Sequence, residues 1–210
     1  DREIVSTTTS RINENTQPQN IFNYNQQVLS SYFSSDWSFN NDIGLKTGVR
    51  YEFTMISGDF KGNEYGNILP NITISKNFSK TKSLKLSYNN RILRPGIQNI
   101  NPNIIRNNDY STTKGNPGLT PANANQIEIS YNQFGRKYQG SYNIYIKNTN
   151  DIIESYSRII NGDEVKKYEN IGASTNYGFN YFGSLRFDKF NLRTGFNLYQ
   201  YKGSGIIDNQ

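Results

Sequence analysis

Apolar and polar residues alternate along this chain in one segment after another, and this alternation limits what the chain can fold into. In residues 43–55 the odd positions are mostly apolar: Ile43, Leu45, Val49, Tyr51, Phe53 and Met55. The even positions are small or polar: Gly44, Lys46, Gly48, Arg50, Glu52 and Thr54. A period of two places one apolar and one polar face on a strand, and almost no stretch shows competing helical periodicity. The sequence therefore predicts an all-β chain.

Hydropathy excludes one kind of membrane protein and leaves another open. Only 34% of the 210 residues are hydrophobic, and no run approaches the roughly 20 apolar residues that a transmembrane helix needs. In a membrane β-barrel only every second residue meets lipid, so the mean hydropathy stays low. The composition is therefore compatible with a chain that crosses a membrane as strands.

The connections between the alternating segments differ in length in a regular way. Short turns are expected at residues 40–42, 80–82, 135–136 and 188–189. Longer stretches rich in Gly, Asn and Pro are expected at 13–23, 58–66, 93–124, around 161–163 and from 203 onward. Tight turns at one end and long loops at the other are typical of outer-membrane barrels, so we expect the short turns in the periplasm and the long loops outside the cell.

About nine strands follow from this division of the chain. They are expected at residues 2–12, 24–39, 43–57, 67–79, 83–93, 125–134, 137–160, 164–187 and 190–202. The two strands that flank Asn161-Gly162-Asp163 are too long for one crossing, so their outer halves should form a hairpin above the membrane, with positive φ at the turn. We predict a transmembrane antiparallel up-and-down β-barrel, present in part. Residues 1–210 would belong to one barrel domain whose closing strands lie outside this chain.

The alternation also assigns side chains to two faces. The expected lipid-facing residues are Phe33, Trp37, Leu45, Val49, Phe53, Leu84, Leu86 and Phe179. The expected lumen-facing polar residues are Lys46, Arg50, Glu52, Lys85, Arg91, Glu128, Lys147, Arg186 and Arg193. For this second set we favour pairing across strands over substrate binding. Lys76 falls on the apolar parity, which predicts a position near a membrane edge, where a long side chain can snorkel.

Five short motifs occur in a fixed order along the chain. They are Arg91-Ile92-Leu93-Arg94-Pro95, Asn101-Pro102, Gly115-Asn116-Pro117-Gly118-Leu119-Thr120-Pro121, Thr149-Asn150-Asp151-Ile152-Ile153 and Tyr168-Glu169-Asn170-Ile171-Gly172. In this order they resemble the barrel portion of the TonB-dependent-receptor-like outer-membrane proteins of Bacteroidetes.

The resemblance implies a large barrel in the bacterial outer membrane, in contact with outer-membrane lipid and closed around its own plug domain. This plug would lie outside the chain, and the lumen-facing polar residues would contact it. It further implies uptake of a glycan, peptide or metal chelate, driven by a TonB-type energy-coupling protein. A surface lipoprotein or a larger envelope complex is a possible partner.

The motif residues of the loop at 94–121 are candidates for a structural or ligand-facing role. They are Arg94, Pro95, Asn101, Pro102, Gly115, Asn116, Pro117, Leu119 and Pro121. Proline fixes φ and biases the preceding residue towards extended geometry, while glycine permits turns that other residues resist. We expect an ordered outer loop, and we favour a structural role at the rim over ligand contact.

Catalytic chemistry has little support in this sequence. The chain has no His and no Cys, which removes Ser-His-Asp triads, Cys nucleophiles and the usual zinc sites. The carboxylates Asp36, Asp42, Asp59 and Asp163-Glu164 lie in expected turns, where Asp is favoured for backbone reasons. The 23 basic residues are scattered rather than clustered, so nucleic acid is not an expected partner. We predict no enzyme activity, no cofactor and no metal site.

Three functions remain in competition. The first is a TonB-dependent receptor barrel, and the second is a non-transporting barrel subunit or scaffold of an envelope protein complex. The third is a soluble secreted β-rich adhesin or glycan-binding module. A plug and a TonB box upstream would separate the first from the second, and membrane fractionation would separate both from the third.

Overall fold

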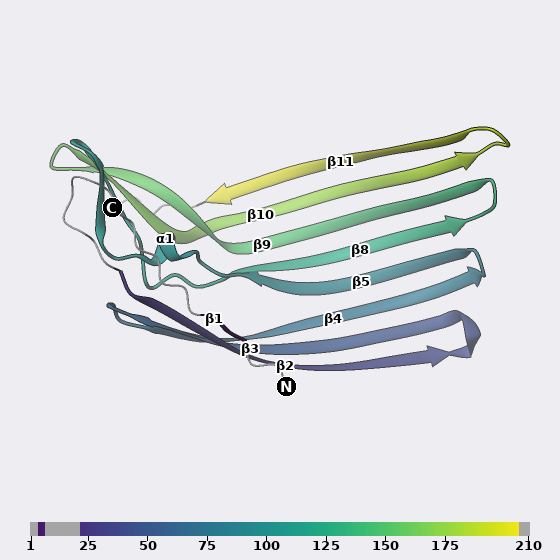
Figure 1. Cartoon of the computed structure of the whole chain (residues 1–210), viewed down its shortest axis with the longest axis horizontal. Helices are drawn as coiled ribbons and strands as arrows, with labels where there is room; N and C mark the ends of the chain where they lie inside the picture. Colours follow the sequence, from purple (N-terminus) through teal and green to yellow (C-terminus); the bar gives the residue numbers. More distant parts are fainter. Residues whose placement is uncertain (1–3, 7–21, 206–210) are drawn as a thin grey trace.

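The computed structural model describes residues 4–6 and 22–205, which form one curled sheet (Figure 1). Its elements are β1 (Ile4–Ser6), β2 (Tyr24–Phe39), η1 (Asn40–Asp42), β3 (Ile43–Gly58), β4 (Asn63–Ser79), β5 (Lys82–Leu93), α1 (Ile97–Ile100), β6 (Ile104–Asn108), β7 (Ser111–Lys114), β8 (Ala122–Phe134), β9 (Tyr138–Ile160), β10 (Asp163–Arg186) and β11 (Asn191–Gly205). Among these residues, no helix has the length and apolar character needed to cross a membrane.

The long strands form an up-and-down meander. β2, β3, β4, β5, β8, β9, β10 and β11 follow one another in space as in sequence, and each pairs antiparallel with the next. The short strand β1 pairs antiparallel with β2. β6 and β7 form a hairpin, and β7 joins the outer part of β10 in parallel. The predicted partial barrel wall of about nine strands is confirmed.

Most expected strands agree with the structure, with two errors. Asp36, which was expected in a turn, lies inside β2 and pairs with Lys46. The loop expected at 58–66 is wrong, because β3 runs to Gly58, β4 begins at Asn63, and Ile56 pairs with Asn63. Backbone pairing with β3 outweighs the turn preference of Gly62, Asn63 and Gly66. Of the strand expected at 2–12, only β1 is described; the remainder, the loop at 13–21 and residues from 206 onward lie outside the described residues.

The two ends of the sheet differ as expected, except that the β3–β4 connection of residues 59–62 is as short as the turns at the opposite end. At one end, on the right in Figure 1, consecutive strands are joined by short turns: η1 and residues 80–81, 135–137 and 187–190. At the other end lie residues 94–121 and the outer halves of β9 and β10, which have 23 and 24 residues. Their tip has φ of 54° at Asn161 and 92° at Gly162, which confirms the predicted positive-φ turn.

The curl gives the sheet a concave and a convex face. Arg94 follows β5, yet its guanidinium contacts Glu52 and Thr54 on β3, across β4, which places these two residues on the concave face. The side chains of residues that are paired on neighbouring strands point to the same face. The strand register therefore shows which residues lie on each face of the whole sheet. The concave face holds Lys46, Arg50, Glu52, Lys85, Arg91, Glu128, Lys147, Arg186 and Arg193. The convex face holds Phe33, Trp37, Leu45, Val49, Phe53, Leu84, Leu86 and Phe179.

Lys76 lies on the convex face, three residues before the end of β4, next to the short turn at 80–81. Its cross-strand partners are Ile43 and Leu84. The structure therefore places this lysine at one end of the apolar face rather than in its middle.

Candidate functional site

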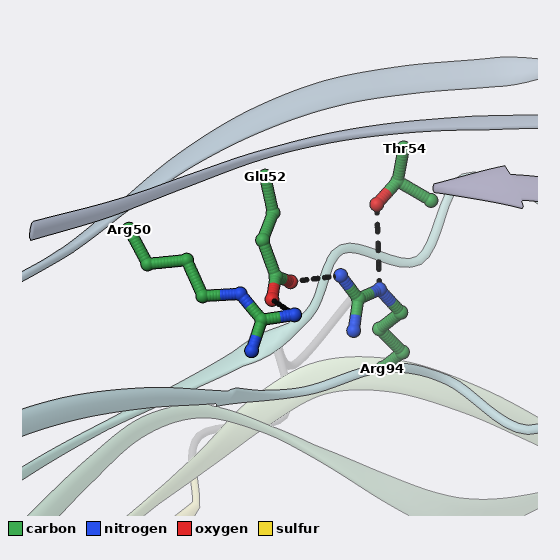
Figure 2. A network of polar contacts seen from close by, with 4 residues as sticks. All are labelled: Arg50, Glu52, Thr54 and Arg94. Atoms are coloured by element: carbon green, nitrogen blue, oxygen red, sulfur yellow. Dashed lines mark hydrogen bonds and ion pairs between the residues drawn. The ribbon is translucent and has the colours of Figure 1, made fainter. Parts of the chain in front are cut away.

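Four polar side chains meet on the concave face near the outer end of β3 (Figure 2). Glu52 forms ion pairs with both arginines. One of its carboxylate oxygens lies 2.6 Å from Arg50 Nη2, and the other contacts Arg94 Nη2. Arg94 Nε also donates a hydrogen bond to Thr54 Oγ1 at 3.3 Å. Arg50, Glu52 and Thr54 alternate along β3, so all three point inward. Arg94 approaches from the start of the loop that follows β5.

Burial makes Glu52 the centre of this cluster. The Glu52 side chain is 5% exposed, whereas those of Arg94 and Arg50 are 25% and 49% exposed. A carboxylate removed from water is costly unless it is paired and hydrogen-bonded, and here both oxygens have a guanidinium partner. Two guanidinium groups share one carboxylate, so the cluster keeps a net positive charge.

A groove of about 790 Å³ opens beside this cluster on the concave face. Arg91, three residues before Arg94, also lines the groove, is exposed, and has no ion pair with any described residue. Its remaining wall is largely neutral and polar, and includes Ser30, Tyr32, Asn71 and Asn89. Glu52 is the only acidic residue of the lining, against three arginines. The groove therefore suits a polar or anionic group.

The loop between β5 and β8 is held closed by its own backbone. Gly115 N donates to Asn101 O at 2.8 Å, and Asn116 N donates to Asn99 O at 2.7 Å. An added Cβ at Gly115 would lie 2.5 Å from Asn101 O, so this crossing requires glycine. Ile100 and Leu119 are each 1% exposed and anchor the two sides of the crossing. The prediction of an ordered loop is confirmed.

Asn170 and Asn116 attach this loop to β10. Asn170 Nδ2 donates to Thr120 O at 2.8 Å and to Asp151 O at 2.7 Å, while Thr120 N donates to Asn170 Oδ1 at 2.9 Å. Asn116 Nδ2 donates to Tyr168 O at 3.2 Å. A single amide of β10 thus ties the loop to both strands of the long hairpin.

The same place carries a break in the β9–β10 ladder. The register shifts between Asn170 and Gly172 and again between Gly172 and Ser174, opposite Asp151, whose φ is 56°. Bulges bend strands and redirect side chains. The motifs at 149–153 and 168–172 therefore mark the point where the hairpin bends away from the wall and receives the loop.

Beyond this bend, the hairpin carries its own polar contacts. Tyr156 O–H donates to Glu169 Oε1 at 2.6 Å across the two strands. This hydrogen bond to a carboxylate favours the protonated phenol and raises the pKa of Tyr156. Glu164 N donates to Tyr110 O at 2.7 Å, where the β6–β7 hairpin joins β10.

The structure brings together only part of the polar set predicted from the sequence. Arg50, Glu52, Arg91 and Arg94 gather at the groove, whereas Lys46 pairs with Asp36 at 3.5 Å on an exposed part of the same face. Lys85, Arg186 and Arg193 lie nearer the short turns. Glu128 accepts hydrogen bonds from Gln126 and Ser130 along its own strand.

Two participants were not singled out from the sequence. Nothing in the alternation distinguishes Thr54 from other small polar residues of β3. Asn170 stood within a recognised motif, but its contacts with Thr120 and Asp151 depend on residues far away in the chain. Among the described residues, no group of three or more His, Cys, Asp or Glu side chains is placed to hold a metal ion.

The fold and the site define a segment of a membrane barrel wall with an elaborate outer rim. All 210 residues match the outer membrane protein beta-barrel family, so the chain belongs to that family and to the bacterial outer membrane. A comparison with curated proteins finds no match.

Solved structures with the same fold include an iron transporter, a copper transporter and a pyoverdine receptor. The FrpB iron transporter from Neisseria meningitidis is 16% identical, with a TM-score of 0.66 over 86% of this chain and 26% of that one. The pyoverdine outer membrane receptor FpvA from Pseudomonas aeruginosa is 14% identical, with a TM-score of 0.68 over 90% and 27%. The copper transporter OprC is 12% identical, with a TM-score of 0.64 over 87% and 29%. This chain thus spans between a quarter and a third of their length.

Proposed function

We propose that this chain is part of the wall of a TonB-dependent outer-membrane receptor that imports a glycan, a peptide or a metal chelate. The observation that carries the proposal is the sorting of side chains: charged groups line the concave face, and large apolar side chains cover the convex one. In this proposal the convex set meets lipid, the concave set faces the lumen, and the long connections lie outside the cell.

In this proposal the groove beside Arg50, Arg91 and Arg94 contacts the imported solute. Its net positive charge attracts anionic groups, and a lumen of restricted dielectric strengthens that attraction. A carboxylate-bearing or phosphate-bearing solute fits this charge better than a neutral one. A plug domain and a TonB-type coupling protein are the partners that this function requires, and a surface lipoprotein is a possible third.

The competing function is a barrel of the same build that serves as a subunit or scaffold of an envelope complex. The well-anchored loop favours neither function, because its hydrogen bonds explain order without reference to a ligand. The third possibility, a soluble adhesin, conflicts with membership of an outer-membrane family.

Uptake in whole cells separates transport from scaffolding. Cells that carry, lack or regain the full-length gene are given labelled ferric siderophore, copper, oligosaccharide and peptide probes, with and without depletion of TonB. The proposal expects that one probe class is lost on gene deletion and on TonB depletion, and that Arg91→Ala reduces its uptake. Unchanged uptake of every probe, together with loss of an envelope complex, would instead establish the scaffold.

A further inference from the structure

A row of polar residues crosses the convex face just beyond its apolar band, on the side of the long connections. The register aligns Asn90 with Asn125, Asn125 with Asn148, Asn148 with Thr175, and Thr175 with Lys202. The row two residues nearer the short turns is largely apolar and includes Ile127, Ile146 and Tyr177. The polar row therefore marks one edge of the apolar surface.

The two halves of this row are organised differently. On β5 and β8, Asn90 Nδ2 donates to Asn123 Oδ1 at 2.8 Å and to Asn125 Oδ1 at 2.7 Å, and Tyr88 O–H donates to Asn125 Oδ1 at 2.7 Å. On β9, β10 and β11, the side chains of Asn148, Thr175 and Lys202 make no hydrogen bond or ion pair with any described residue. The polar side chains on β5 and β8 hydrogen-bond to one another, whereas those on β9, β10 and β11 are available to bind a ligand.

The available half surrounds a small polar pocket. It has a volume of about 320 Å³ and is lined by side chains that include Asn148, Asn150, Thr175, Lys202 and Ser204. Lys202 is its only charged lining residue, so the pocket is cationic. Amides and hydroxyls suit the hydroxyls of a sugar, and a lysine ammonium suits a phosphate.

An apolar groove adjoins this pocket on the same face. It has a volume of about 630 Å³ and is lined mainly by apolar side chains that include Ile129, Ile144, Ile146, Phe179 and Leu198. Tyr177, which lies two residues from Thr175 on β10, belongs to the groove and connects it with the pocket. An apolar groove that ends at a cationic polar pocket matches an amphiphile with an acyl chain and an anionic headgroup.

We propose that β9, β10 and β11 bind one outer-leaflet lipid, a phosphorylated glycolipid. Its headgroup lies against Lys202, Asn148 and Asn150, and an acyl chain follows the groove past Ile146 towards Ile129. This inference rests on the proposed function, because it requires the convex face in lipid and the long connections outside the cell. It adds a specific lipid site to a surface that would otherwise contact bulk lipid.

Native mass spectrometry of the full-length protein in mild detergent tests this site. The probes are lipid A, a bisphosphorylated disaccharide glycolipid, and a phosphatidylcholine, each titrated separately. Lys202→Gln should weaken lipid A binding about fivefold, since one lysine near an anionic lipid surface contributes about that factor. Lys76→Gln is the matched control, because Lys76 lies on the same face at the opposite edge. Asn148→Ala should also weaken binding, whereas Asn90→Ala should not.

The outcomes separate the lipid site from the underlying function. Equal binding of the two lipids, or equal binding by wild type and Lys202→Gln, would overturn the lipid site. A nitroxide at Leu86→Cys in the same preparation reports whether the convex face meets lipid. If this nitroxide contacts lipid while lipid A shows no preference, the inference alone fails; if it contacts water, the proposed function fails as well.

Discussion

The regular wall and the outer rim of this molecule are held together in different ways. In the wall, for example along residues 174–186 of β10, backbone ladders run without a register shift and side chains alternate between two faces. At the rim, single side chains such as Asn170 and Glu52 each join two or three distant segments. The stability of the wall should therefore depend on whether the residues of each face are polar or apolar. The stability of the rim should depend on the identity of single residues.

The largest effect is expected from a charge on the convex face of the wall. Ile144→Lys places an ammonium in the middle of the apolar band, where Ile144 is 58% exposed. Lysine at a lipid-facing midplane position costs about 2 to 4 kcal/mol. Urea unfolding of the full-length protein in lipid vesicles measures this loss.

Asn197→Lys is its control, since Asn197 pairs with Asn180 on the concave face. We expect little change in its unfolding free energy. Similar losses for the two lysines would mean that the faces do not differ in environment.

The next effect is expected at the ion-pair cluster of the rim. Glu52→Ala leaves the partly buried Arg94 without its carboxylate. Removal of one partner of a buried pair costs about 3 to 5 kcal/mol, and because Arg94 keeps a quarter of its exposure we expect about 2 to 3 kcal/mol.

Asp36→Ala breaks the exposed pair with Lys46 and should cost less than about 1 kcal/mol. The temperature at which the folded band disappears in a heat-modifiability gel compares the two variants. A larger drop for Asp36→Ala would contradict the assignment of Glu52 as the centre of the cluster.

A smaller and more local effect is expected at the loop anchor. Asn170→Ala removes two hydrogen bonds that join the loop to β10 and one that joins β10 to β9, and each contributes about 1 kcal/mol or less to stability. We expect faster tryptic cleavage at Arg106 and Lys114 of the loop, with the wall still folded. Asn197→Ala serves as the control, and equal cleavage rates would show that Asn170 does not hold the loop.

The smallest effect is expected at the tip of the long hairpin. Gly162 has φ of 92°, and an added Cβ there meets nothing within 4 Å, so Gly162→Ala isolates the cost of the backbone conformation. This cost is about 1 to 2 kcal/mol. Gly96 is equally open but has φ of −73°, so Gly96→Ala should be neutral. Hydrogen exchange at the hairpin tip should accelerate only for the first variant.

Much of the wall was predictable because each strand is encoded by the residues of its own segment. Alternation identifies a strand, and once one residue is assigned to a face, its neighbours in the strand alternate between the two faces. The assignments of Phe33, Lys85 and Phe179 to two faces therefore agree with the register. Lys76 was placed correctly at one end of the apolar face for the same reason.

The rim was less predictable because its contacts join segments that are distant in sequence. Proline and glycine in residues 94–121 indicated order, but not that β7 would pair in parallel with β10. Likewise, the spacing of Glu52 and Arg94 does not indicate that they meet, because the contact depends on the curl of the sheet. At Asn63 the local turn preference was misleading, since pairing with Ile56 outweighed it.

The assignment of the two faces is tested most directly by nitroxide accessibility in the full-length protein reconstituted into vesicles. Labels are attached to single cysteines replacing Phe33, Leu86 and Phe179 on the convex face, and Lys85, Glu128 and Arg193 on the concave face. We predict that dissolved oxygen relaxes the first three labels more strongly, and that a water-soluble nickel complex relaxes the last three more strongly. Strong relaxation by nickel at Leu86 and Phe179, with protection at Lys85 and Glu128, would contradict it.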